Sequence, residues 1–427
     1  MNANVLNLPQ YRVLKVDESE HDYHVHTEIA VERTPCPQCR SCNVHRWGAR
    51  EILFKDLPMH GKRVGMYVRA RRLRCDDCGK TFQERLPALS EKRLMTERLA
   101  SWVGKQSLKR PFTSIADEVG VDERTIRNIF RDYVNELEAQ FEVETPTWLG
   151  IDEIDILKPR CVVANIESTT IVNILADRNK KTVAGYLHVL PQRERVKYVA
   201  VDMWTPYRDA VRAVLPQATV VVDKFHVVRM TNVAMEQVRK GLRASLPPKQ
   251  RRGLMHDRFI LLKRSHDLTA QEQFLLDNWS SLHPTLGEAY RLKEGFFGVY
   301  DAPNKAAAEM HYRAWESSIP HVVRSAFAPI LTAWDNWHPE ILSYFDHPIT
   351  NAYTESLNNL IRVMNRLGRG YSFEALRAKI LFTQGPRKHE SARPKFEGRN
   401  HERNLGVDIP TLTAMIEDGR FSAGLNR

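Results

Sequence analysis

The spacing of hydrophobic positions divides the chain into stretches with different periods. Residues 145–224 alternate short apolar runs with amphipathic stretches, a pattern typical of strands connected by helices. Strands are expected at residues 147–157, 161–167, 170–176, 196–203 and 219–223. Helices are expected at 180–189, from near Pro206, and throughout 90–140 and 225–348.

The order of three strands, a helix, a strand, a helix and a strand predicts a ribonuclease-H-like α/β core. In this fold the first and fourth strands are neighbours in the sheet. Here the first strand delivers Asp152 and the fourth delivers Asp202, each at the end of an apolar run. Carboxylate oxygens are the preferred ligands of Mg²⁺ and Mn²⁺, so these two side chains are candidates for one catalytic metal site. For either aspartate alone, an acid that starts a turn is the alternative interpretation.

A third acid, Glu355, lies on an expected helix. The apolar stripe of this helix consists of Tyr353, Leu357, Leu360, Ile361 and Met364. Asn351, Glu355 and Asn358 lie on another face. A helix laid against the sheet would direct Glu355 to the two aspartates, with Asn351 and Asn358 as supports. The alternative is an ordinary solvated helix face.

Asp223 competes with Asp202 for the role of the second acid. It ends the next expected strand, and it either takes part in catalysis or caps the helix that begins near Phe225. His226 follows in the first turn of that helix. We interpret His226 as a structural or DNA-facing residue rather than as a metal ligand.

Two cysteine pairs indicate a metal site near the N-terminus. Cys36 and Cys39 form one CxxC motif, and Cys75 and Cys78 form the other. The two thiolates of each tight turn can bind one ion, and two such turns complete a tetrahedral Zn²⁺ site. We therefore expect a zinc ribbon with a structural ion and with Cys42 outside the ligand set. A redox function of the CxxC pairs is the alternative.

Positive charge is concentrated in the same part of the chain. Residues 31–110 contain 19 Lys and Arg against 8 Asp and Glu, an excess equal to the net charge of +11 of the whole chain. Such a block is typical of proteins that bind a polyanion. Within it, an expected strand is predicted to contact DNA phosphates through Arg69, Arg71, Arg72 and Arg74. A solvated basic face is the alternative explanation.

Residues 112–129 have the pattern of a helix-turn-helix. Ile115, Ala116 and Val119 form an apolar face. Gly120 permits a turn, and Asp122 is suited to cap the second helix. That helix would present four residues to DNA, namely Arg124, Thr125, Arg127 and Asn128. An ordinary helical hairpin packed in a core is the alternative.

These features predict a multidomain α+β protein. Its parts are expected to be a lead-in with modest structure (1–30), a zinc ribbon (31–88), a helix-turn-helix DNA-binding domain (89–144), the first part of a ribonuclease-H-like core (145–224), an all-helical insertion (225–348), the Glu-bearing helix of the core (349–385) and a basic C-terminal tail (386–427). The sequence shows no apolar run as long as a membrane span and no secretory signal. We expect a cytoplasmic protein that binds double-stranded DNA, with neither a membrane partner nor a small-molecule substrate.

The sequence resembles the ISL3 family of bacterial insertion-sequence transposases over residues 30–385. The resemblance is carried by Asp152-Glu153, Val201-Asp202-Met203-Trp204, Asp223-Lys224-Phe225-His226 and Asn351-Ala352-Tyr353-Thr354-Glu355. It implies a DDE transposase whose catalytic triad is Asp152, Asp202 and Glu355. Such an enzyme would carry out Mg²⁺- or Mn²⁺-dependent strand cleavage and transfer between the terminal inverted repeats of its own element and target DNA. We expect it to act as a homodimer or a larger oligomer on DNA.

Two other functions remain open on the sequence. A DNA-binding regulator with a catalytically degenerate ribonuclease-H-like domain fits everything before residue 140 equally well. A structure-selective nuclease without strand transfer would use the same acids. The complete triad argues against the regulator, because a pure binding protein does not need three acids on a surface that holds DNA. Inverted repeats around the coding gene would separate the transposase from the nuclease.

Overall fold

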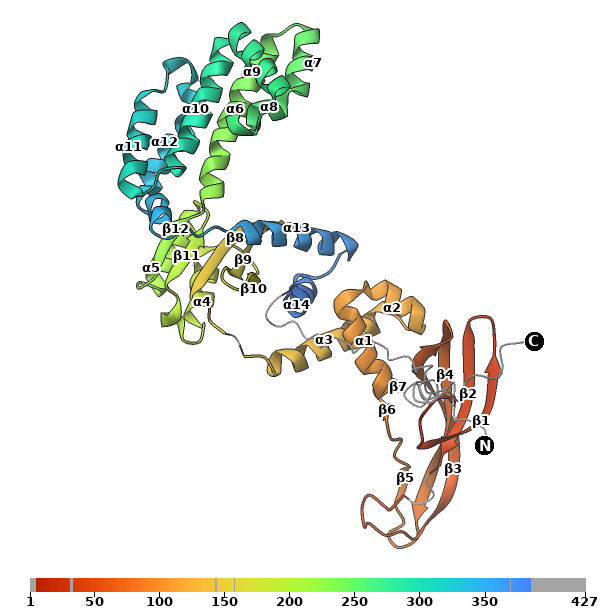
Figure 1. Cartoon of the computed structure of the whole chain (residues 1–427). Helices are drawn as coiled ribbons and strands as arrows, with labels where there is room; N and C mark the ends of the chain where they lie inside the picture. The colour runs from red at the N-terminus through yellow and green to blue at the C-terminus, as the bar shows by residue number, and fades with distance from the viewer. Residues whose placement is uncertain (1–4, 31–33, 143, 157, 369, 385–427) are drawn as a thin grey trace, which may run out of the picture. The chain divides into compact units, whose positions relative to one another are not determined.

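The computed structural model describes residues 5–30, 34–142, 144–156, 158–368 and 370–384. The expected basic tail, 386–427, lies outside the described residues. In the described part the chain forms two β-sheets and many helices, so the expected mixture of helices and strands is confirmed (Figure 1). None of the helices described is both long and apolar enough to cross a membrane.

The N-terminal sheet has the strand order β1-β2-β4-β3-β7-β6, and β5 pairs with β4. Its strands are β1 (Tyr11–Glu18), β2 (Asp22–Ile29), β3 (Val44–Met59), β4 (Lys62–Cys75), β5 (Thr81–Gln83), β6 (Leu89–Ser90) and β7 (Met95–Thr96). The expectation of modest structure in residues 1–30 is wrong, because β1 and β2 belong to this sheet and Tyr11 is buried in its core. β1 is difficult to predict from the sequence because Leu14 and Val16 are apolar but exposed. They break the alternation of apolar and polar residues that is typical of a strand.

Three helices follow this sheet, with the geometry expected of a helix-turn-helix. They are α1 (Glu97–Lys109), α2 (Phe112–Val119) and α3 (Glu123–Ala139). Gly120 ends α2 with φ of 73°, a backbone conformation that favours glycine. Asp122 caps α3, since its Oδ1 accepts a hydrogen bond of 2.9 Å from the N–H of Thr125. The predicted turn and cap are both confirmed.

The second sheet has the strand order β10-β9-β8-β11-β12. Its strands are β8 (Trp148–Ile156), β9 (Lys158–Asn165), β10 (Thr170–Leu175), β11 (Tyr198–Val201) and β12 (Thr219–Val222). β8, β11 and β12 run parallel to one another, whereas β9 is antiparallel to both β8 and β10. The expected strand positions are confirmed, and the first and fourth of these strands, β8 and β11, are neighbours as predicted.

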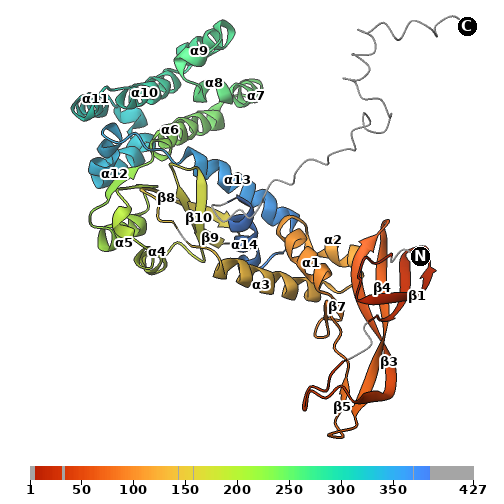
Figure 2. The ribbon, with the colours of Figure 1, turned by 60° about the horizontal axis from the view of Figure 1, so that its bottom comes forward.

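Helices cover both faces of the second sheet (Figures 1 and 2). They are α4 (Lys180–His188), α5 (Thr205–Val214), α13 (Ala352–Leu367) and α14 (Phe373–Gln384). Val183 of α4 and Val211 of α5 share an apolar cluster with Ile151 of β8. Leu357 of α13 belongs to a different cluster, with Ile154 of β8. Because successive residues of a strand point to opposite faces, α13 and Asp152 lie on the same side of the sheet.

The described chain between β12 and α13 consists mainly of helices. The α-helices are α6 (Lys224–Ser245), α7 (Pro248–His256), α8 (Arg258–Leu262), α9 (Ala270–Leu282), α10 (Pro284–Tyr300), α11 (Lys305–Ser317) and α12 (His321–Leu342). Aromatic residues fill their core, where the rings of Tyr312 and Trp334 stack with centroids 3.6 Å apart. Trp315 and Trp337 are also buried there. These tryptophans therefore have a packing role.

The helix-turn-helix packs directly on α14 through a buried lysine. Lys379 of α14 is 2% exposed, and its ammonium donates hydrogen bonds to the carbonyls of Ser107 and Arg110 at the end of α1. The same group lies 4.7 Å from the ring centroid of Phe112 and 4.6 Å from that of Tyr371. A cation held by carbonyls and aromatic faces compensates part of its lost hydration, so this contact links the two parts of the chain.

Candidate functional site

Asp152 and Asp202 lie side by side on neighbouring parallel strands. Ile151 of β8 pairs with Val201 of β11, so the two aspartates follow at the same level of the sheet. Asp152 lies within its strand, because β8 continues to Ile156 along β9. What ends at Ile151 is the pairing of β8 with β11. The structure therefore brings the two acids together at the point where these strands separate.

Asp223 follows β12, next to Asp202, but both of its carboxylate oxygens have backbone partners. Oδ1 accepts a hydrogen bond of 3.0 Å from the N–H of Phe225, which caps α6. Oδ2 accepts one of 3.1 Å from the N–H of Asn351. Asp223 thus has the capping role that the sequence offered as an alternative, and it also fixes the residue from which α13 starts.

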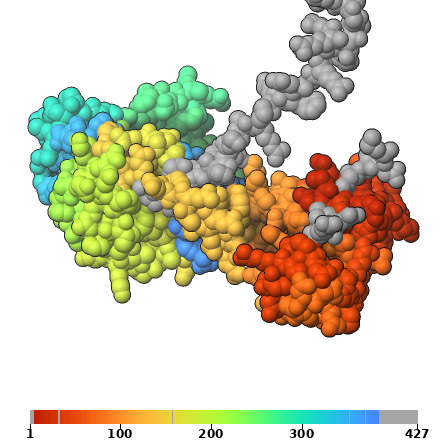
Figure 3. Space-filling model, turned by 90° about the horizontal axis from the view of Figure 1, so that it is seen from below, coloured from red at the N-terminus to blue at the C-terminus, as the bar shows by residue number. Residues whose placement is uncertain are grey.

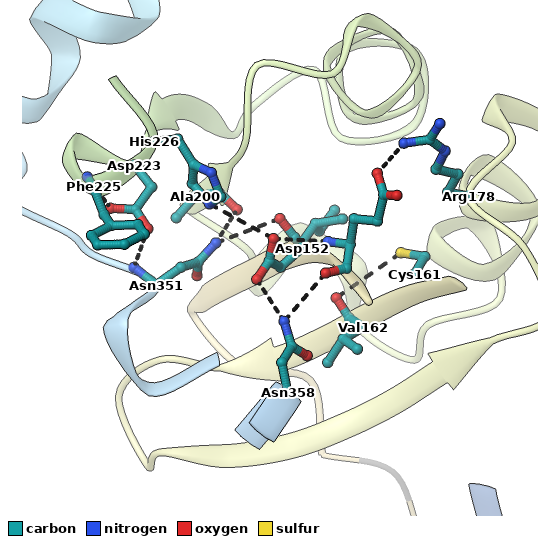
Figure 4. A network of polar contacts seen from close by, with 12 residues as sticks. Asp152, Cys161, Val162, Arg178, Ala200, Asp223, Phe225, His226, Asn351 and Asn358 are labelled. Atoms are coloured by element: carbon teal, nitrogen blue, oxygen red, sulfur yellow. Dashed lines mark hydrogen bonds and ion pairs between the residues drawn. The ribbon is translucent and has the colours of Figure 1, made fainter. Parts of the chain in front are cut away.

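Asn351 and Asn358 fasten α13 to the strands that carry the acids (Figure 4). Nδ2 of Asn351 lies 3.5 Å from the carbonyl oxygen of Ile151 and 3.4 Å from that of Ala200. Only glycine allows this approach at position 150, because a Cβ there would lie 2.3 Å from Oδ1 of Asn351. Nδ2 of Asn358 donates a hydrogen bond of 2.9 Å to Oδ2 of Asp152. Both asparagines therefore hold α13 against the strands that carry the two aspartates.

His226 also reaches the site. It lies in the first turn of α6, and its Nε2 is 3.7 Å from Oδ1 of Asp152. This proximity opposes the effect of burial on the pKa of Asp152. His226 therefore lies close to Asp152 and also belongs to the first turn of α6.

Glu355 is a candidate acid that the structure does not bring into contact with Asp152 or Asp202. Its side chain is exposed in the first turn of α13, and no hydrogen bond or ion pair of the described residues joins it to either aspartate. Nor do any three carboxylates of the described chain come within the mutual distance of a metal cluster. Glu355 nonetheless precedes Asn358 by three residues, about 60° around the helix, so it flanks the side that faces Asp152.

Burial and mutual repulsion disfavour ionisation of the aspartates. Burial raises the pKa of Asp202 to about 7, with further contributions from Asp152 and Glu153. Burial likewise raises the pKa of Asp152 and of Asp223. Oδ1 of Asp202 is buried and has no hydrogen-bond partner among the described residues. Two adjacent carboxylates that repel each other, such as Asp152 and Asp202, fit a divalent cation such as Mg²⁺ or Mn²⁺.

Three further residues adjoin the acids and were not singled out from the sequence as site residues. Glu153 forms an ion pair with Arg178, which lies in the turn after β10. The guanidinium of Arg178 lies 4.1 Å from the ring centroid of Trp204. Glu153 and Trp204 stand in the motifs that carry the family resemblance, but no pattern in the sequence marks Arg178, because only the folded chain places this turn beside the end of β11.

The four predicted zinc ligands form one cluster. The sulfur atoms of Cys36, Cys39, Cys75 and Cys78 all lie within 4.8 Å of one another. Hydrogen bonding from the backbone of Cys39 lowers the pKa of Cys36 to about 7, which favours the thiolate that binds metal. Cys42 is exposed and stands outside the cluster. This donor set fits a structural Zn²⁺ ion, as the sequence predicted.

The arginines of β4 have different environments. Arg69 and Arg72 are exposed. Arg71 instead forms an ion pair of 2.7 Å with Glu84, whose side chain is fully buried. Arg74 lies over the exposed ring of Trp47, 4.7 Å from its centroid. Part of the surface of this N-terminal region is drawn in red in the space-filling view (Figure 3). Arg69 and Arg72 are thus accessible to a phosphate, although Arg72 also donates a hydrogen bond of 3.4 Å to Thr81, while Arg71 is held by Glu84.

The first turns of α3 carry the four residues expected to face DNA. Arg124, Arg127 and Asn128 are exposed. The Nε of Arg127 donates a hydrogen bond of 2.9 Å to Glu123. The hydroxyl of Thr125 donates to Asp122 as part of the cap. Three of the four side chains are therefore accessible, whereas Thr125 has a role in the helix start.

Comparison with known proteins matches the chain in three consecutive stretches. Residues 32–78 match the zinc-finger of transposase IS204/IS1001/IS1096/IS1165, and residues 84–134 match the helix-turn-helix domain of transposase family ISL3. Residues 149–380 match the ISL3 transposase family model. The chain is 27% identical over 354 residues to the transposase for insertion sequence element IS1001 of Bordetella parapertussis, an alignment that covers 79% of this chain and 85% of the relative. The matched stretches contain the four cysteines, the helix-turn-helix and all candidate acids.

Proposed function

Because this chain belongs to the ISL3 family of transposases, we propose that it is a DDE transposase that cuts and joins DNA at the terminal inverted repeats of its own insertion sequence. In this proposal Asp152, Asp202 and Glu355 bind Mg²⁺ or Mn²⁺. The observation that carries it is the adjacency of Asp152 and Asp202 on parallel strands, where burial raises the pKa of both. A site of this kind is stabilised by a cation and can act on a phosphodiester.

The strand order supports a ribonuclease-H-like core. Three antiparallel strands, β10, β9 and β8, are extended by the parallel strands β11 and β12. In our proposal the helices α6 to α12 are an insertion between β12 and the Glu-bearing helix α13. The core would then comprise residues 145–224 and 349–385, with the insertion at 225–348.

The choice of Asp202 over Asp223 follows from their hydrogen bonds. Both oxygens of Asp223 accept hydrogen bonds from backbone N–H groups. Oδ1 of Asp202 has no such partner among the described residues. We therefore assign metal binding to Asp202, and to Asp223 the role of anchoring α6 and α13.

Two asparagine side chains orient the proposed metal ligands. Divalent ions, when bound, activate a water or a 3′-hydroxyl and stabilise the leaving oxygen. Asn358 orients Asp152 through its hydrogen bond of 2.9 Å. Asn351 holds the start of α13 against β8 and β11, so that Glu355 extends from a fixed helix on the accessible side. No serine, tyrosine or cysteine nucleophile is required, so no covalent protein–DNA intermediate is expected.

DNA binding is assigned to the basic N-terminal part. The zinc ribbon would contact phosphates through Arg69 and Arg72, and α3 would enter the major groove with Arg124, Arg127 and Asn128. The element ends and the target are both double-stranded DNA, so two copies of the protein would hold two ends. We therefore propose a homodimer or a larger oligomer in the bacterial cytoplasm.

The separation of Glu355 from the aspartates favours a second candidate, a DNA-binding regulator with a degenerate catalytic domain. The deciding experiment incubates the full-length protein with duplexes that carry the element ends, with and without Mg²⁺, and maps the products. Cleavage at the repeat boundary that disappears in Asp152→Asn supports the transposase. Binding without cleavage in either Mg²⁺ or Mn²⁺ supports the regulator, and cleavage without strand joining supports a nuclease.

A further inference from the structure

Trp204 is a large aromatic residue that the fold does not bury. It lies two residues after Asp202, at the start of α5, and is 37% exposed. Its neighbour Met203 packs against the apolar core, but Trp204 belongs to none of the apolar clusters formed by the described residues. An exposed aromatic side chain beside a catalytic acid is therefore available to a ligand.

Arg178 connects this indole to the acids. Its guanidinium lies 4.1 Å from the ring centroid of Trp204, and its Nη1 pairs with Glu153, the neighbour of Asp152. Arg178 also contributes to the electrostatic environment of Asp202. Within the described part of the chain, Nε and Nη2 of Arg178 donate no hydrogen bond. These two nitrogens can therefore donate hydrogen bonds to an acceptor on a bound ligand.

A second arginine–tryptophan pair, in the apolar core, has a structural role and serves as a comparison. The guanidinium of Arg208 lies 3.9 Å from the ring centroid of Trp337, which is only 4% exposed and belongs to the apolar core. Arg208 also donates a hydrogen bond of 2.7 Å to the carbonyl of Asn336. The Trp204 pair differs in the exposure of its indole and in its place beside the acids.

Indole and guanidinium match the two parts of a nucleotide. Aromatic faces stack on any base, which makes the contact tolerant of sequence. A guanidinium presents paired donors to phosphate oxygens. Glu153 compensates the charge of Arg178 while no DNA is present, and a phosphate can replace it as the acceptor.

We propose that Trp204 and Arg178 bind the nucleotide next to the scissile phosphate, with its base against the indole and its phosphate on the guanidinium. The inference rests on the proposed function, because it requires DNA at Asp152 and Asp202. It assigns to the site a position that holds the strand in place while the neighbouring phosphodiester reacts.

The test uses the full-length protein with Asp152→Asn, so that bound DNA is not cut. End duplexes carry 2-aminopurine at each nucleotide flanking the mapped cleavage position, one at a time, and fluorescence is read at saturating protein. Stacking on Trp204 should quench one of these positions. Trp204→Leu, which keeps bulk without an aromatic face, should abolish the quenching, and Trp204→Phe should retain much of it. Trp47→Ala, at an exposed tryptophan of the N-terminal sheet, should leave it unchanged.

The rate of cleavage gives an independent readout in the protein with intact acids. Trp204→Leu should lower the single-turnover rate about ten- to a hundredfold. Arg178→Ala should have a similar effect, and Arg178→Lys an intermediate one, because lysine keeps the charge but not the paired donors.

Quenching that persists in Trp204→Leu would overturn the inference. So would equal rates for Trp204→Leu and Trp204→Phe, because a merely structural role does not depend on an aromatic face. Melting temperatures of the variants show whether a rate loss follows from unfolding. If the unsubstituted protein does not cut end DNA at all, the proposed function fails. If it cuts while quenching is independent of Trp204, only this inference fails.

Discussion

Asn358 donates a hydrogen bond of 2.9 Å to Oδ2 of Asp152, although the two residues are 206 positions apart in the chain. The same amide nitrogen lies 3.3 Å from the carbonyl oxygen of Glu153. Asn358 itself is 3% exposed, so this bond forms away from competing water. It ties the helix that carries Glu355 to the first acid and sets the orientation of that carboxylate.

Replacing Asn358 with alanine should slow DNA cleavage and leave DNA binding intact. Loss of a buried hydrogen bond to a charged group costs about 1.5–3 kcal/mol, so we expect a rate about ten- to a hundredfold lower. Asn359→Ala is the matched control, because Asn359 is exposed and accepts a hydrogen bond only from Arg362 within the described residues. Single-turnover cleavage and fluorescence anisotropy of end DNA measure the two effects. Equal rates for both variants would show that Asn358 does not orient the acid.

Amide substitutions of the three proposed metal ligands should slow DNA cleavage without weakening DNA binding. Asp152→Asn, Asp202→Asn and Glu355→Gln should each lower the cleavage rate on the order of 10³-fold or more, because each removes a ligand that stabilises the transition state. Affinity for end DNA in the absence of divalent ions should be unchanged or higher, since a negative charge near the phosphates is removed. Gel-shift and cleavage assays on the same duplex give both values.

Asp223→Asn tests the choice of the second acid. Since Asp223 accepts hydrogen bonds from the N–H groups of Phe225 and Asn351, its amide variant should lose thermal stability and part of its activity. If Asp223→Asn abolishes cleavage at an unchanged melting temperature while Asp202→Asn remains active, the second metal ligand is Asp223.

Several parts of this fold could be predicted because the sequence determines them locally. The apolar runs before Asp152 and Asp202 predict β8 and β11, and Gly120 with Asp122 predicts the turn before α3. The contacts of Asn351 and Asn358 could be suggested from helix geometry, but their partners depend on how α13 packs on the sheet. The position of Arg178 depends on tertiary structure alone. The strand β1 was missed because its exposed face carries Leu14 and Val16.

The zinc site should be required for the structure of the N-terminal sheet. Cys39→Ser should lower the zinc content of the full-length protein from about one ion per chain to near zero, because it removes one of four ligands. Cys42→Ser should leave the zinc content unchanged, since Cys42 lies outside the cluster. Metal analysis and circular dichroism with and without a chelator measure the effect. Loss of zinc in Cys42→Ser with full zinc in Cys39→Ser would show that the ligand set is wrong.

Arg127 should contribute to recognition of the element ends. It is exposed on the second turn of α3, where a recognition helix contacts base edges. Arg127→Ala should reduce the preference for end DNA over random DNA by about five- to a hundredfold, the size of one base contact. Arg131→Ala, one turn further along α3, is the control. Equal losses on both DNAs would identify Arg127 as a phosphate contact.

The raised pKa of Asp202 predicts how the stability of the metal-free protein depends on pH. Because burial raises this pKa from 3.8 to about 7, the folded state retains a proton between these pH values that the unfolded state releases. Stability contributed by Asp202 is therefore present below pH 4 and is lost as the pH rises to 7. Asp202→Asn removes this loss, so it should raise the melting temperature at pH 8 by more than it does at pH 4.

With a divalent cation present, the unsubstituted protein should melt at a higher temperature than Asp202→Asn at pH 8, which is the reverse of the order expected without metal. Mg²⁺ binds the ionised carboxylates of the folded state and should raise the melting temperature of the unsubstituted protein at pH 8, in proportion to the logarithm of its concentration above Kd. Asp202→Asn should respond little, because one ligand is missing. Differential scanning calorimetry at pH 4 and pH 8, each with and without Mg²⁺, tests both statements. A melting temperature of Asp202→Asn that rises with Mg²⁺ as steeply as that of the unsubstituted protein would show that Asp202 does not bind the ion.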